Sequence, residues 1–314
     1  MATCLSTPLD AAAVGVAYNP AHTRMGVIDG GGRVTVWQRQ DAYSRTWVAA
    51  SSWSGGMRLT VLAWASDEHG PVLAGGATDG TVCIWEEAAG DAGWVLKAKL
   101  AESSHSVHHM AFAPPQYGPI LAAAYADGCV RFFEASEPLA ADSWDLQNEL
   151  QASQQSKACT SLAWRPHSAR LPPLLLVGTA ADSAQVWMYR EPLMRWELAT
   201  SLGTLQADYH SKPISSVAWA PALGRPVELV AVAAGSRVII WSLQGAADSM
   251  QVERVAVLEH GAAVWRVEWN MLGSWLAAST EGGEVCLWRP DLLGEWLLVN
   301  KIVAKQGEGG RMHD

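Results

Sequence analysis

The stretch AVWRVEWNMLGSWLAASTEGGEVCLW, residues 263–288, decides the fold and holds four of the chain's 17 tryptophans. Apolar and polar residues alternate up to Trp269, small residues follow, and a Glu-Gly-Gly turn leads into a second apolar run that ends at Trp288. Alternation with period two on either side of a glycine turn is typical of antiparallel strands joined by a hairpin. The same unit recurs through the rest of the chain.

Six copies of the unit follow one another. An aromatic residue closes a short apolar run, at intervals of 46 to 55 residues, at Tyr18, Trp64, Phe112, Trp164, Trp219 and Trp269. A second aromatic ends a β-branched run 19 to 23 residues later, at Trp37, Trp85, Phe133, Trp187, Trp241 and Trp288. A third position is tryptophan in five units, at Trp47, Trp94, Trp144, Trp196 and Trp296. Units of about 40–50 residues with four short strands are typical of propeller blades. The sequence therefore predicts an all-β propeller of six blades in which aromatic side chains fill the space between neighbouring sheets.

The repeat sets the predicted domain boundaries. A single propeller is expected over residues 14–303, preceded by an N-terminal segment, 1–13, and followed by a short flexible tail, 304–314. The longest insertions, 135–157 and 242–255, are predicted to be loops.

Composition excludes several classes of function. A net charge of −9 with 17% charged residues argues against direct binding to nucleic acid. No run approaches the roughly 20 apolar residues of a membrane helix, and the first residues lack the basic and apolar regions of a secretory signal. The five cysteines form no CxxC pair, which predicts neither a disulfide framework nor a zinc site, and a reducing compartment is expected.

No catalytic or cofactor site is predicted. Signatures such as GxSxG, HExxH and GxxxxGK[ST] are absent. His108 and His109 are adjacent in a strand, so their rings should point to opposite faces of the sheet and share no metal. The glycine-rich stretch DGGGRV, 29–34, occupies a hairpin-turn position, and Cys83 and Cys286 occupy equivalent packing positions. We expect no enzyme activity, no metal and no cofactor.

The six units resemble WD repeats over about Val14 to Val303. Residues 112–135, 159–189 and above all 263–296 resemble the SEH-type nucleoporins, the Sec-homologue propellers of the outer-ring Y complex of the nuclear pore. The chain departs from the ordinary WD pattern, because no unit ends in Trp-Asp. The hydrogen-bonded His, Ser/Thr, Asp, Trp network of WD blades is complete nowhere; the sixth unit, for example, has His260 and Trp288 but Glu281.

The resemblance implies an open propeller whose seventh blade comes from an α-solenoid scaffold nucleoporin. The implied role is a non-enzymatic scaffold that assembles the Y complex and supports transport of protein and mRNA, located at the nuclear envelope. Two alternatives stay open. One is a subunit of the related vacuolar or lysosomal nutrient-signalling coat or of a COPII-type vesicle coat, with a cytoplasmic or membrane-associated location. The other is a closed WD-repeat substrate receptor of a ubiquitin ligase, which needs a seventh blade that the sequence does not show.

A missing blade would leave two sheet faces and their edges exposed. Candidate residues for the binding of an inserted strand are Val14, Val16 and Tyr18 in the first unit and Trp265, Val267 and Trp269 in the last. Trp265 lies four residues before Trp269, which predicts the same strand face; it either packs between blades or lines the slot. Alternatively, residues 1–13 form a closing strand, although Pro8 argues against a central one.

Overall fold

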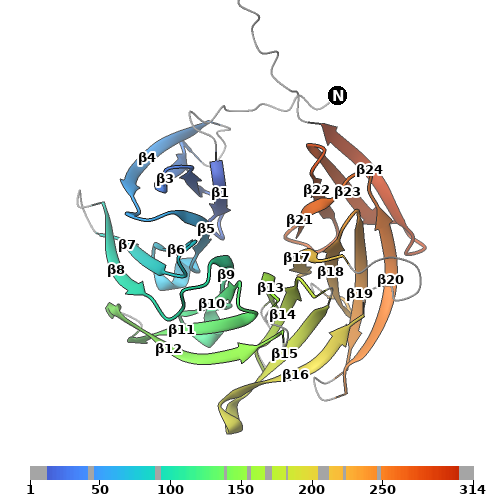
Figure 1. The fold of residues 1–314 in the computed structure, drawn as a ribbon. Helices are drawn as coiled ribbons and strands as arrows, with labels where there is room; N and C mark the ends of the chain where they lie inside the picture. Colours follow the sequence, from blue (N-terminus) through green and yellow to red (C-terminus); the bar gives the residue numbers. More distant parts are fainter. Residues whose placement is uncertain are drawn as a thin grey trace, which may run out of the picture.

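The computed structural model describes residues 13–303 apart from 42–45, 89–92, 138–139, 154–156, 167–171, 182, 204–211, 222–223 and 246–248. Its strands form six four-stranded sheets, each antiparallel and each built from consecutive strands. The sheets are arranged in a ring that stays open between the first blade, in blue, and the sixth, in red (Figure 1). The prediction of an all-β, open, six-bladed propeller is confirmed.

The first three blades comprise twelve strands: β1 (Ala13–Tyr18), β2 (Arg24–Asp29), β3 (Arg33–Arg39) and β4 (Trp47–Ser54); β5 (Leu59–Trp64), β6 (Val72–Ala77), β7 (Val82–Glu87) and β8 (Trp94–Leu100); β9 (Val107–Phe112), β10 (Ile120–Tyr125), β11 (Cys129–Glu137) and β12 (Ala140–Gln151). Short 3-10 turns at Asp67–His69 and Pro115–Tyr117 join the first two strands of the second and third blades.

The last three blades comprise β13 (Cys159–Trp164), β14 (Leu174–Thr179), β15 (Ala184–Arg190) and β16 (Arg195–Leu202); β17 (Ile214–Trp219), β18 (Glu228–Ala234), β19 (Arg237–Gln244) and β20 (Gln251–Glu259); β21 (Val264–Trp269), β22 (Leu276–Thr280), β23 (Glu284–Pro290) and β24 (Trp296–Val303). A 3-10 turn, Glu191–Leu193, joins β15 to β16.

Small residues line the second strands because neighbouring blades crowd together there. A Cβ atom added to Gly75 on β6 would lie 2.7 Å from the Trp85 ring of the same blade. A Cβ atom added to Gly76 would lie 2.7 Å from Cγ1 of Val107, on the next blade. Larger side chains at these positions would clash with their neighbours.

The core consists of five apolar clusters, one at each contact between consecutive blades. In every cluster the aromatic residues at the repeat's own positions come from the later blade and pack mainly on aliphatic residues of the earlier one; between blades five and six, for example, Trp269 and Trp288 pack against Val238 and Ile240. The earlier blade adds aromatic residues to two clusters, such as Trp53 from the first blade and Phe132 from the third. Each aromatic position of the repeat therefore faces the preceding blade.

Two predictions about local structure are wrong or incomplete. Residues 135–157 and 242–255 are largely strand, because β12 pairs with β11 from Cys129↔Gln151 onward and β20 pairs with β19. Outer strands carry polar side chains toward solvent, which makes their sequences look like loops. The His–Trp bond of the WD network does form in the sixth blade, where the Trp288 indole donates to Nε2 of His260 at 3.1 Å.

Candidate functional site

The open seam is the surface where the sixth blade would meet the first. The innermost strands touch in sequence order, β1 with β5, β5 with β9, β9 with β13, β13 with β17, and β17 with β21. No comparable contact joins β21 to β1 in the part of the chain that the structure describes (Figure 1). Each end blade therefore has one face without a neighbouring sheet.

The first blade exposes its aromatic face to this seam. Tyr18 is 49% exposed, whereas Trp64, which holds the same place in the second blade, is 9% exposed. Val16 is 37% exposed, against 6% for the equivalent Leu62. The ten aromatic core residues predicted from the repeat are Trp37, Trp64, Trp85, Phe112, Phe133, Trp164, Trp187, Trp219, Trp241 and Trp288. Among them, Trp37 alone lies in none of the five clusters.

The sixth blade exposes its aliphatic face to the seam. Ile302 on β24 pairs with Val285 in the same register as Leu258 pairs with Val238 in the fifth blade. Leu258 is buried against the sixth blade, but Ile302 is exposed because no sheet follows. The two faces of the seam are thus the two halves of an ordinary contact between blades.

A β-bulge places Trp265 on the seam side of its strand. The register of β21 against β22 shifts between Val264 and Arg266, so Val264 takes the buried place that strict alternation gives to Trp265. Trp265 is 64% exposed. The prediction that it shares a face with Trp269 is therefore wrong, and the reason is one extra residue in the strand.

The structure gathers only part of the predicted residue set at the seam. Val16, Tyr18 and Trp265 lie there, and Val14 is exposed at the bulge of β1, where the register shifts between Ala13 and Gly15. Val267 and Trp269 instead face the fifth blade and belong to the cluster that it forms with the sixth. The alternative closing strand, 1–13, falls almost wholly outside the described residues, as does the tail 304–314.

Sequence reasoning missed a hydrogen-bond pattern carried by five residues at the end of each innermost strand. These first-strand segments are VGVAY (14–18), TVLAW (60–64), HHMAF (108–112), TSLAW (160–164), SSVAW (215–219) and WRVEW (265–269). Their first residue donates to a carbonyl of the next blade in three cases: Thr60 to Val107, His108 to Cys159 and Ser215 to Val264. The first and last segments begin with Val14 and Trp265 in place of a polar residue, and an alignment of the six segments would have revealed this difference.

His108 and His109 both contact the fourth blade, which differs from the prediction of opposite faces. His108 Nδ1 lies 3.2 Å from the carbonyl oxygen of Cys159, and His109 Nδ1 accepts from the backbone N–H of Leu162 at 3.3 Å. A register shift in the pairing of β9 with β10 explains the difference. Burial lowers the pKa of His109 to about 4, and the positive charge of Arg266 acts in the same direction.

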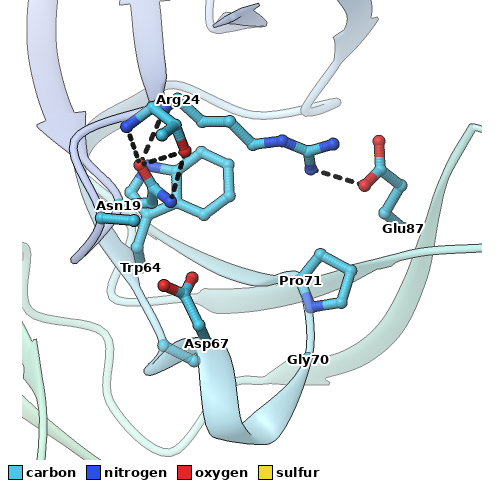
Figure 2. Close-up of a pocket in the computed structure, with 10 residues that line it drawn as sticks. Asn19, Arg24, Trp64, Asp67, Gly70, Pro71 and Glu87 are labelled. Atoms are coloured by element: carbon cyan, nitrogen blue, oxygen red, sulfur yellow. Dashed lines mark hydrogen bonds and ion pairs between the residues drawn. The ribbon is translucent and has the colours of Figure 1, made fainter. Parts of the chain in front are cut away.

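A pocket of about 330 Å³ at the rim of the first two blades shows what a closed contact looks like. Arg24 Nη1 forms a 2.5 Å ion pair with Glu87 Oε2 across the two blades, beside the Trp64 ring (Figure 2). Asn19 Oδ1 accepts from the backbone N–H of Arg24 at 2.7 Å. The Arg24–Glu87 ion pair joins the two blades, and the Asn19 bond closes the turn between β1 and β2 within the first blade.

The described residues contain no group of His, Cys, Asp and Glu side chains placed to hold a metal ion. Cys83, Cys129, Cys159 and Cys286 are free and buried. In the glycine-rich stretch, Asp29 Oδ1 accepts from the backbone N–H groups of Gly31 and Arg33, which makes the stretch a side-chain-capped turn. No helix in the described ranges has the length and apolar character to cross a membrane.

Comparison with known proteins agrees with this architecture. The family model of the WD domain, G-beta repeat, matches residues 58–86 and 252–289. The chain is 31% identical to nucleoporin SEH1-A of Xenopus laevis, over 94% of this chain and 85% of that protein. It is 32% identical to human nucleoporin SEH1, over 90% and 82% of the two chains, and 30% identical to protein SEH1 of Arabidopsis thaliana, over 94% and 97%.

The chain belongs to the SEH1 family of WD-repeat nucleoporins. The resemblance that residues 112–135, 159–189 and 263–296 indicated is thereby confirmed. Its relatives are named as nucleoporins. Within this chain the largest departure from a closed WD propeller is the open seam, which makes the seam the candidate functional site.

Proposed function

We propose that this member of the SEH1 family is a non-enzymatic scaffold of the nuclear pore. Its open propeller docks on an α-solenoid nucleoporin that supplies a seventh blade, and the complex forms part of the outer-ring Y assembly. The protein works at the nuclear envelope and supports transport of protein and mRNA. Its other partners are the remaining outer-ring nucleoporins.

The exposed seam carries this proposal. Val16 and Tyr18 on one side and Ile302 on the other leave apolar side chains in water that equivalent residues bury elsewhere in the ring, and Trp265 adds an exposed indole. Apolar surface of this kind typically marks a protein interface. A donated sheet suits the site because each face is one half of a sheet-to-sheet contact, and one sheet between them would complete both.

The two alternatives make different demands on the same site. A ubiquitin-ligase receptor with a closed ring needs a seventh blade, and the described strands form six. A vacuolar, lysosomal or vesicle-coat subunit would use the seam in the same manner with another scaffold. The proteins that bind through the seam therefore distinguish the pore from the other coats.

The test is affinity purification of the full chain from cells, followed by mass spectrometry, with two matched variants. Tyr18→Asp places a charge on the seam, whereas Leu198→Asp places one on the outer strand of the fourth blade; both original side chains are 49% exposed. We expect the wild-type chain and Leu198→Asp to retrieve outer-ring nucleoporins and an α-solenoid protein. Tyr18→Asp should reduce that recovery at least ten-fold, because an unpaired charge in a buried contact costs several kcal/mol.

Two results would contradict the proposal. Recovery of ligase subunits or vesicle-coat proteins in place of nucleoporins would show that the protein belongs to another assembly than the nuclear pore. Equal recovery by Tyr18→Asp and Leu198→Asp would show that the scaffold binds outside the seam.

A further inference from the structure

The closed contacts between blades define what the seam lacks. In three blades the tryptophan that ends the first-strand segment donates its indole N–H to a backbone carbonyl of the preceding blade. The bonds run from Trp64 to Ala17 at 3.0 Å, from Trp164 to Ala111 at 3.0 Å and from Trp269 to Ala218 at 3.3 Å. In each case the accepting carbonyl belongs to the residue just before the aromatic of the earlier blade. Glu268 holds this place in the sixth blade, and no indole of the described chain donates to it.

A second bond runs forward from the same segments. The side chain three residues before the aromatic accepts a backbone N–H from the next blade: His109 from Leu162 at 3.3 Å, Ser161 from Val217 at 3.1 Å, and Ser216 from Val267 at 3.2 Å. The donor is always the residue two before the next aromatic. In the first blade this residue is Val16, which faces the seam.

We propose that the segment which fills the seam carries a tryptophan at the end of its innermost strand and an accepting side chain three residues earlier. The indole N–H donates to the carbonyl of Glu268, and the accepting side chain takes the N–H of Val16. One strand thereby joins the sixth blade to the first. This inference rests on the proposed function, since it specifies the chemistry of the partner's donated strand.

The pattern selects among possible occupants. Residues 1–12 and 304–314 contain no tryptophan, so they do not supply it. In a second copy of the chain, Ser161–Trp164 and Ser216–Trp219 have this spacing, but the indole of Trp164 already donates to the carbonyl of Ala111 and that of Trp219 to the carboxylate of Glu228. The occupant that fits is a β-strand segment of a different chain with the spacing acceptor, two residues, tryptophan.

The fourth blade supplies a probe, because Trp164 and Ser161 make both bonds there. The full chain is extended after residue 314 by a second copy of residues 158–203. A matched extension uses residues 13–54, the first blade, in which Gly15 and Tyr18 provide neither the acceptor nor the indole. Hydrogen–deuterium exchange of residues 13–18 reports whether β1 is covered.

The extension by the fourth blade should slow exchange of β1 at least ten-fold, and the extension by the first blade should not. Within the appended copy, Trp164→Phe and Ser161→Ala should each raise the exchange rate of β1 about five-fold above that of the unaltered extension, the effect of one net hydrogen bond. Trp196→Phe in the copy is the control: in the native blade its ring stacks on Phe132 at 4.5 Å, and it makes no bond to a carbonyl of the preceding blade among the described residues.

Several outcomes overturn the inference: no slowing by the fourth blade, equal slowing by the first blade, or equal effects of Trp164→Phe and Trp196→Phe. Slowing that appears only with dimer formation on gel filtration assigns the seam to a second copy and also overturns it. The unmodified chain's recovery of nucleoporins is a separate readout, so either hypothesis can fail while the other stands.

Discussion

Tyr18 and Trp64 occupy the same place in consecutive blades, yet the first faces water and the second lies against a neighbouring sheet. Their strands are alike, so the difference comes from what precedes each blade in the ring. A contact between blades has one half that carries the aromatic positions of the repeat and another that is mainly aliphatic, contributed by different repeats. A chain with six repeats forms five such contacts and leaves one half of a sixth at each end.

The largest expected effect compares Trp85 with Trp37, the second aromatics of the second and first blades. Trp85 is buried between blades and lies 5.8 Å from Trp53 of the first blade, centroid to centroid. Trp85→Ala should lower the free energy of unfolding by about 3–5 kcal/mol, the usual cost of a large buried cavity. Trp37→Ala should cost less than half of that, because its ring has no blade in front of it. Urea unfolding of both variants measures the difference, and equal losses would contradict the division into closed and open halves.

The sequence predicts blades better than it predicts the seam. Aromatic spacing fixes six units, since each buried ring needs a partner sheet at a constant interval. The faces of Val267, Trp269 and Trp265 were not predictable in the same way, because a single bulged residue at β21 shifts the alternation on which the assignment depends. The same kind of shift places His108 and His109 against one neighbour.

A smaller effect compares His109 with Ser216, which accept equivalent N–H bonds in different closed contacts. The pKa of His109 is lowered from 6.5 to about 4 by burial and by Arg266. The unfolded chain therefore binds the proton more readily than the folded one. The contribution of neutral His109 to the free energy of unfolding is fully present above pH 6.5 and is lost as the pH falls toward 4. Between pH 7 and pH 5 the loss should be about 1–2 kcal/mol, measured by urea unfolding at each pH.

His109→Ser is the matched variant, because Ser161 and Ser216 show that a hydroxyl accepts the same bond. We expect this variant to lose the part of the pH dependence that belongs to His109 and to keep stability near pH 7. An unchanged pH profile would show that the neutral imidazole is not required at this contact.

The smallest effect compares the loss of one polar group in a closed contact with the loss of one at the open seam. Trp164→Phe removes the N–H that donates to the carbonyl of Ala111 but retains most of the apolar ring. The free energy of unfolding should fall by about 1–2 kcal/mol, because the hydrogen bond and part of the buried ring area are lost together. Tyr18→Phe removes a hydroxyl at the open face, where water replaces any partner, and should change stability by less than about 0.5 kcal/mol.

Binding of the scaffold should make the aromatic ring at position 18 important. Once a donated blade covers Tyr18, its environment matches that of Trp64, and a change at this position becomes a change inside a closed contact. Tyr18→Phe should then remain neutral, since the phenyl ring still packs, whereas Tyr18→Ala should weaken the complex about ten-fold or more. If Tyr18→Ala leaves scaffold affinity unchanged while it lowers the stability of the free chain, the first blade is not half of an interface, and its exposed aromatic face has another use.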